Sequence, residues 1–128
     1  MGWFLPISVV VLLFAGCSTA DTSNFQSLPP GDASRGAQLF QQSVNGVPPC
    51  ASCHSLDGSV IVGPSLKGIS TRTGTHIAGM DVTNYTYQSI TRPAAYIVSG
   101  YSNLMYNQFD QKLTPQQIAD LIAYLRTL

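Results

Sequence analysis

Residues 50–54 read Cys50-Ala51-Ser52-Cys53-His54, and this pentapeptide decides how the chain folds. Two thiols three residues apart can each add to one of the two vinyl groups of a porphyrin, and the adjacent imidazole then points at the porphyrin iron. CxxCH is the attachment motif for c-type haem, and its chance frequency in a chain of this length is below about one in a thousand. The motif therefore predicts one covalent haem c, attached at Cys50 and Cys53, with His54 as an iron ligand.

Two other kinds of site use closely spaced cysteines, and neither suits this sequence. A thioredoxin-like redox pair belongs in a βαβ setting, for which the sequence has no pattern. A zinc ribbon needs four ligands, but only Cys17 and His76 remain among the Cys and His residues outside the motif. With two thiols on haem, a free Cys17 in an exported chain still needs an explanation.

The other face of the iron has three candidate ligands, Met105, Met80 and His76. Met105 is favoured because it lies in the loop 101–109, just before a well-capped helix. Met80 is more simply an apolar side chain that holds its loop on the core. His76, among Thr and Gly residues, is more simply a solvated side chain, and an iron with one face open is the remaining alternative.

The predicted fold class is all-α, with about four short helices and long loops. The clearest helix covers residues 115–127, because Thr114 is a good N-cap and Gln117 completes a capping box. The other three helices are predicted at residues 33–42, 83–91 and 93–99. No stretch alternates as a strand does.

A glycine inside a predicted helix and an unusually long loop both indicate how the domain packs. Gly36 lies inside a predicted helix, where it costs about 1 kcal/mol relative to Ala, so we expect a close backbone contact there. The stretch 55–82 is rich in Gly, Ser and Thr and is predicted to be loop. Loops this long are unusual in a compact domain unless they wrap something, and a haem would fill that place.

The composition limits the class of protein. The 128 residues suffice for one domain. Six Lys and Arg balance six Asp, no Glu is present, and only 9% of residues are charged, against about 25% in an ordinary soluble domain. Such a chain lacks the basic stripe that nucleic-acid binding requires. Its 45% apolar content also argues against disorder.

The N-terminal segment reads as an export device. Residues 2–16 carry no charge, but about 15 residues fall short of the roughly 20 that cross a bilayer as a helix, so they suit the apolar part of a signal peptide. The run ends at Phe14-Ala15-Gly16-Cys17, which resembles a bacterial lipoprotein signal, in which the Cys is lipidated and becomes the new N-terminus. An uncleaved membrane anchor and a plain signal with a bystander Cys17 are the alternatives.

We therefore expect three regions: a signal peptide or N-terminal membrane anchor at 1–16, a lipidated Cys17 and flexible tether at 17–30, and a folded domain at 31–128. The expected location is outside the cytoplasm, anchored to a membrane and facing the periplasm or exterior of a bacterium. Lipid on Cys17 and haem on the other two cysteines leave no thiol for a disulfide.

Residues 31–128 resemble the class I monohaem c-type cytochromes. Gly31 to Gly36 with Leu39 and Phe40 resembles the N-terminal helix of that family, and residues 121–125 resemble the C-terminal helix that crosses it. The resemblance implies that Gly36 and Phe40 pack near Tyr124. It also implies that the carbonyl of Pro64, in Gly63-Pro64-Ser65-Leu66, accepts a hydrogen bond from His54, which orients the imidazole.

The chain departs from that family in several ways. Tyr106 follows Met105, where the family usually has Pro. The stretch 41–49 before CxxCH is longer than usual, and is either a plain surface loop or part of a partner contact. No Trp follows Trp3, so the contact that some relatives make between a Trp and the haem propionates is absent, and Arg72, Tyr96 and Tyr101 are the candidates to replace it. The lysine ring used for docking by mitochondrial relatives is missing, since only Lys67 and Lys112 occur.

The resemblance implies a one-electron carrier with His54 and Met105 as axial ligands, and not an enzyme. Its implied partners are redox complexes: a quinol-oxidising complex, a terminal oxidase or a photosynthetic reaction centre, as a shuttle or a permanent subunit. Because charges are few and balanced, docking should be apolar, with little electrostatic steering. A haem enzyme or gas-binding sensor with a labile ligand at Met105 is the alternative function.

Overall fold

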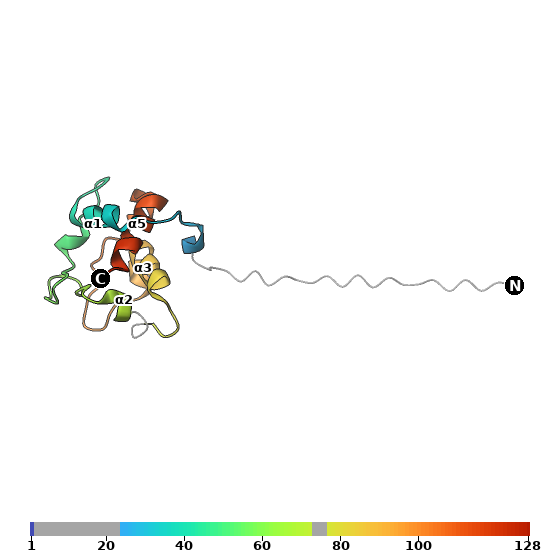
Figure 1. Cartoon of the computed structure of the whole chain (residues 1–128). Helices are drawn as coiled ribbons and strands as arrows, with labels where there is room; N and C mark the ends of the chain where they lie inside the picture. Colours follow the sequence, from blue (N-terminus) through green and yellow to red (C-terminus); the bar gives the residue numbers. More distant parts are fainter. Residues whose placement is uncertain (2–23, 73–76) are drawn as a thin grey trace.

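The computed structural model describes Met1, residues 24–72 and residues 77–128. The predictions for the export signal, for Cys17 and for His76 concern residues outside these ranges. The described part is all-α, which confirms the predicted fold class. Five α-helices and three short 3-10 helices occur in it, joined by long loops (Figure 1).

Two helices from opposite ends of the domain's sequence cross each other, α1 (Ala33–Gln41) and α5 (Pro115–Leu125). The expected contact at Gly36 is confirmed, because a Cβ placed there would come within 2.0 Å of the Asp120 carbonyl oxygen. Phe40 is almost fully buried, and its ring meets that of Tyr124 edge to face at 5.7 Å between centroids. Glycine thus lets the two backbones approach closely enough for these rings to pack.

Capping residues determine where α1 and α5 begin. The Asp32 side chain accepts a hydrogen bond from the N–H of Arg35 at the start of α1. Thr114 and Gln117 form the predicted capping box at the start of α5. The helix α5 ends at Leu125, two residues before the predicted limit, and α1 ends one residue before its limit.

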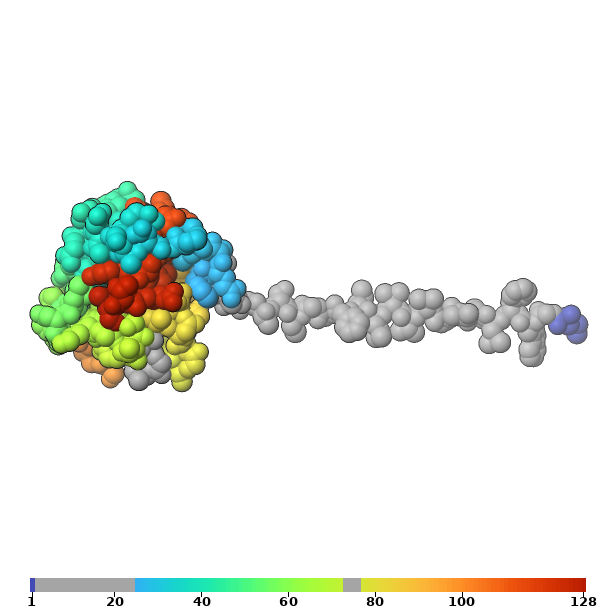
Figure 2. Space-filling view, in the orientation of Figure 1, coloured from blue at the N-terminus to red at the C-terminus, as the bar shows by residue number. Residues whose placement is uncertain are grey.

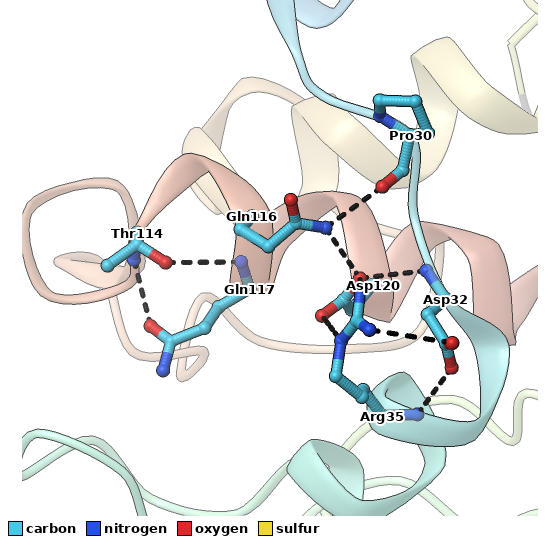
Figure 3. A network of polar contacts seen from close by, with 7 residues as sticks. All are labelled: Pro30, Asp32, Arg35, Thr114, Gln116, Gln117 and Asp120. Atoms are coloured by element: carbon cyan, nitrogen blue, oxygen red, sulfur yellow. Dashed lines mark hydrogen bonds and ion pairs between the residues drawn. The ribbon is translucent and has the colours of Figure 1, made fainter.

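A buried carboxylate, which the sequence pattern did not reveal, fastens α1 to α5 (Figure 3). Asp120 is only 2% exposed. It accepts hydrogen bonds from the Asp32 N–H at 2.8 Å, from Arg35 Nε and Nη2, and from Gln116 Nε2. The bonds from Arg35 are the main cause that lowers the pKa of Asp120, so the carboxylate stays charged at neutral pH. We call these four residues the Asp120 network.

The middle of the domain contains α3 (Val82–Thr91), close to its predicted position. Asp81 caps it by accepting from the N–H groups of Thr83 and Asn84. The helix predicted at 93–99 is wrong beyond its first turn, because the 3-10 helix η4 (Pro93–Ala95) is followed by extended backbone at Tyr96. Ile97 and Val98, which are β-branched, favour that extended conformation.

Two single-turn helices were not predicted, α2 (Ile69–Arg72) and α4 (Phe109–Lys112). α2 lies inside the stretch 55–82 that was expected to be loop. Each helix buries one apolar residue, Ile69 in α2 and Phe109 in α4. Helices of four residues carry too little periodicity to be recognised in a sequence, and tertiary burial of that one side chain stabilises them.

The long stretch before CxxCH is more than a plain surface loop. Asn45 and Gly46 both have positive φ, at 53° and 79°, and turn the chain back so that Val44 pairs with Val47. Val47 is then buried in the core. The Asn45 side chain donates to the carbonyl oxygen of Lys112 at 2.9 Å, which attaches the turn to the end of α4.

Candidate haem site

A cavity of about 410 Å³ lies between the CxxCH turn, α2, α3, α5 and the loop that carries Met105. Its volume falls within the range of about 300–1,000 Å³ that small-molecule and cofactor sites have in proteins. The walls are mainly apolar, and their buried members come from four helices: Ile69, Tyr85, Ile90, Phe109, Leu121 and Leu125. This lining suits the apolar faces of a porphyrin.

The motif itself forms one helical turn at the edge of this cavity. The 3-10 helix η2 (Cys50–Ser52) is closed by bonds from the N–H groups of Cys53 and His54 to the carbonyl oxygen of Cys50, at 3.1 and 3.0 Å. Cys50, Cys53 and His54 all line the cavity. Before haem is attached, burial raises the pKa of the Cys50 thiol to about 11; the thioether formed with haem carries no titratable proton.

His54 is held in one orientation by the loop that follows it. Its Nδ1 lies 2.8 Å from the carbonyl oxygen of Pro64, which is the hydrogen bond that the family resemblance implies. A carbonyl oxygen can only accept, so Nδ1 carries the proton and Nε2 keeps its lone pair for a metal. Gly63 allows this approach, since a Cβ there would come within 2.6 Å of the imidazole carbon Cε1.

The structure describes two of the three candidate ligands for the opposite face of the iron, Met105 and Met80, and places them differently. Met105 lines the same cavity as His54. Met80 is partly buried against the core cluster, and among the described residues it does not belong to the cavity lining. Its position agrees with the simpler interpretation of Met80 as an apolar side chain that holds its loop.

All three residues proposed for the propionates reach the cavity: Arg72, Tyr96 and Tyr101. Arg72 stands at the end of α2, and its Nη2 donates to the carbonyl oxygen of Ser65 at 2.9 Å. Among the described residues of the lining, Arg72 is the one Lys, Arg or Asp side chain. Arg72 is exposed at the edge of the cavity, where a guanidinium would suit the carboxylates of a cofactor.

Four exposed aliphatic residues stand at the edge of the cavity and were not predicted from the sequence. Val60 and Leu104 are 72% and 71% exposed, and Val62 and Ile97 are more than 40% exposed. All four belong to the cavity lining, and we call them the aliphatic rim. The sequence contains a partial signal for this rim, because the apolar run 60–62 lies between Gly58 and Gly63 and belongs to no predicted helix.

Comparisons with known proteins agree with this site. The family model of cytochrome c matches residues 33–128. A cytochrome c-553-like protein of Synechocystis sp. is 35% identical over 98 residues, covering 77% of this chain and 70% of the relative. A cytochrome c of Gossypium barbadense is 30% identical over 120 residues, which cover 81% of this chain and 96% of the relative. A cytochrome c of Theileria parva is 29% identical over 113 residues, which cover 77% of this chain and 88% of the relative.

The matched region contains the CxxCH turn, the cavity and the crossing of α1 with α5. A cavity of this size and lining, with two thiols and an oriented imidazole at its edge, fits a covalent porphyrin. The chain therefore belongs to the cytochrome c family, and is an electron carrier with covalent haem c on Cys50 and Cys53 rather than an enzyme.

Proposed function

We propose that His54 and Met105 are the axial ligands of the haem, and that the protein carries single electrons between redox proteins. The observation that carries this is the bond of His54 Nδ1 to the Pro64 carbonyl oxygen at 2.8 Å, in a cavity that Met105 also lines. The haem supplies the Fe(III)/Fe(II) couple, and a Met ligand raises its reduction potential. The chain orients the imidazole and surrounds the porphyrin with apolar side chains.

An optical spectrum tests this ligand set. The oxidised holoprotein should show a weak band near 695 nm, which is a property of the cytochrome family with Met on iron. Met105→Ala should abolish the band, while Met80→Ala, the matched control, should keep it. Loss of the band in Met80→Ala alone would contradict the assignment. A high-spin spectrum that changes when CO is added would favour the alternative, a haem enzyme or gas sensor.

Arg72 is the residue that we assign to the haem propionates. Its support is the position at the cavity lining and the bond to the Ser65 carbonyl oxygen, which fixes the guanidinium near the edge of the site. Arg binds carboxylates in a bidentate geometry that Tyr cannot offer. Tyr96 and Tyr101 are secondary candidates for the same carboxylates.

We also propose that the chain is exported and held to a membrane through Cys17. The support is the uncharged run 2–16 that ends at Cys17, together with membership of a family whose haem proteins typically work outside the cytoplasm. None of the helices in residues 24–72 and 77–128 is long and apolar enough to cross a bilayer. An uncleaved anchor at 1–16 is the second way to hold the domain there.

Mass spectrometry of the mature protein tests the anchor. We expect a chain that begins at Cys17 and carries a diacylglycerol and one haem. A chain that begins at Met1 would indicate the uncleaved anchor, and a chain that begins elsewhere without lipid would exclude both. The proposed partners are membrane-bound redox complexes, with the anchor raising their effective concentration. Reduction by a purified quinol-oxidising complex at physiological rates would support that role.

A further inference from the structure

The turn before CxxCH carries a chemically reactive pair of residues, Asn45 and Gly46. Of the five Asn residues in the sequence, Asn45 is the one that Gly follows. An Asn followed by Gly deamidates more readily than other Asn residues, because glycine has no side chain to hinder the ring closure. Asn45 and Gly46 are both exposed, and Figure 2 shows the segment around residues 42–48, coloured teal, at the surface of the domain. Water therefore has access to this pair.

The Asn45 side chain joins this turn to the segment that carries Met105. Its Nδ2 donates to the carbonyl oxygen of Lys112 at 2.9 Å, and Lys112 is the last residue of α4. The last carbonyl groups of a helix have no partner within the helix, so this bond caps α4. At the start of α4, the ring of Phe109 meets that of Tyr106 at 5.2 Å between centroids. One side-chain amide thus connects the turn to the part of the cavity lining that contains Met105.

We propose that Asn45 is a deamidation site, and that its deamidation releases α4 from the turn 44–47. The backbone nitrogen of Gly46 forms a bond to Cγ of Asn45, and the bond from Cγ to Nδ2 breaks. The proton of the attacking nitrogen leaves with the amide as ammonia. Water then opens the resulting succinimide at either carbonyl and gives Asp or isoaspartate. Neither product has a side-chain N–H, so neither can donate to the Lys112 carbonyl oxygen.

The contacts of the turn slow this reaction while it is folded. Ring closure requires rotation of the Asn45 side chain, which the bond to Lys112 opposes. It also requires rotation of the backbone between Asn45 and Gly46, which have the positive φ values of a two-residue hairpin. That hairpin is held by the bond from the Val47 N–H to the Val44 carbonyl oxygen at 3.0 Å, and by burial of Val47. Deamidation therefore follows opening of the turn, and afterwards the bond to α4 cannot form again.

Peptide mapping by mass spectrometry tests the site in the holoprotein at mildly alkaline pH. The tryptic haem peptide 36–67 contains Asn45 and no other Asn, so a gain of about one mass unit there reports on this site. We expect Asn45 to deamidate before the other four Asn residues, which are internal controls. In the folded holoprotein the rate should be at least about tenfold lower than in guanidinium, which corresponds to an opening free energy of about 1.4 kcal/mol.

Either of two results of this mapping would overturn the proposal. If Asn45 stays intact in guanidinium while other Asn residues react, it is not a deamidation site. If its rates are equal in the folded and the unfolded holoprotein, the bond to Lys112 does not restrain the side chain.

Two variants of the holoprotein test the release of α4. Asn45→Asp has the side chain of one product, whereas Asn45→Gly lacks the donor, adds no charge and still accepts positive φ. In both, hydrogen exchange read by mass spectrometry should be about fivefold faster at the amides of residues 111–113, which donate to Gln108 and Phe109. A factor of five corresponds to about 1 kcal/mol, the contribution of one hydrogen bond. Asn107→Asp, the same change at an exposed Asn before α4, is the control and should not accelerate exchange.

Unchanged exchange at residues 111–113 in both variants of Asn45 would overturn the release. Faster exchange in Asn45→Asp alone would show that the added charge opens α4, and would contradict loss of the donor as the cause. These measurements involve neither the axial role of Met105 nor the membrane anchor, so their failure would leave the proposed function unaffected.

Discussion

The two sides of this domain are built on different principles. Where α1 crosses α5, the contacts are protein to protein: a glycine lets the backbones meet, two rings pack, and the buried Asp120 accepts bonds from three other residues. On the side of the cavity, long loops and single-turn helices together with one face of α3 and of α5 enclose a volume of about 410 Å³. The first side is complete without a cofactor, and the second is completed by haem.

The largest effect is expected when haem attachment is blocked. In the double variant Cys50→Ser and Cys53→Ser, amide exchange in the loops 55–66 and 96–106 should accelerate by about two orders of magnitude, because losing a bound partner removes several kcal/mol. The amides of α1 and α5 should lose less protection. Hydrogen exchange read by mass spectrometry measures this. An equal loss in all segments would show that the two sides are not independent.

The next largest effect should come from Gly36→Ala. The added Cβ would lie 2.0 Å from the Asp120 carbonyl oxygen, so the helices must separate, at a cost of about 3 kcal/mol. Denaturant unfolding of the holoprotein measures the loss. Ser34→Ala, on the exposed face of the same helix, is the control and should change stability by less than about 0.5 kcal/mol. Similar stability of the two variants would argue against the tight crossing.

A smaller effect is expected from Asp120→Asn, about 2 kcal/mol, because charge-assisted hydrogen bonds from Arg35 and the Asp32 N–H are weakened. The pKa of Asp120 is lowered in the folded protein. This carboxylate therefore stabilises the fold at pH above its unfolded pKa, and the contribution is lost as pH falls through the folded pKa.

Unfolding free energies measured between pH 7 and pH 3 should consequently fall less steeply in Asp120→Asn than in the unaltered protein. Asp110→Asn, on α4, serves as the matched control for removing one carboxylate. Parallel pH profiles for Asp120→Asn and the unaltered protein would show that another group causes the acid sensitivity.

The smallest expected effect is on the midpoint reduction potential of the haem. Arg72→Gln removes a positive charge from the cavity lining and should lower the midpoint potential, because a nearby cation favours the reduced haem. The expected shift is less than about 59 mV, the value of a tenfold change for one electron. Arg72→Lys should recover most of it, and Arg92→Gln is the control. An unchanged potential in Arg72→Gln would remove Arg72 as the propionate partner.

The difference between the two sides also explains what the sequence revealed. The motif and the glycine at position 36 are short patterns with one structural meaning, and the Pro64 hydrogen bond was implied by the family resemblance. The structure contains both the hydrogen bond and the close crossing at Gly36. The Asp120 network was missed because its members are far apart in the sequence: Asp120 is 88 positions from Asp32 and 85 positions from Arg35. The helices α2 and α4 were missed because four residues show no period. The axial role of Met105 and the lipidation of Cys17 remain predictions.

The long separation within the Asp120 network has a consequence for the order of events during synthesis. The partner of Arg35 and Asp32 is made near the end of the chain, so the crossing of α1 with α5 cannot form until residue 120 has left the ribosome or the export channel. Contacts of such long sequence separation form slowly. Until then Leu121 and Leu125 are absent from the cavity wall, and residues 50–54 remain accessible to whatever delivers the haem.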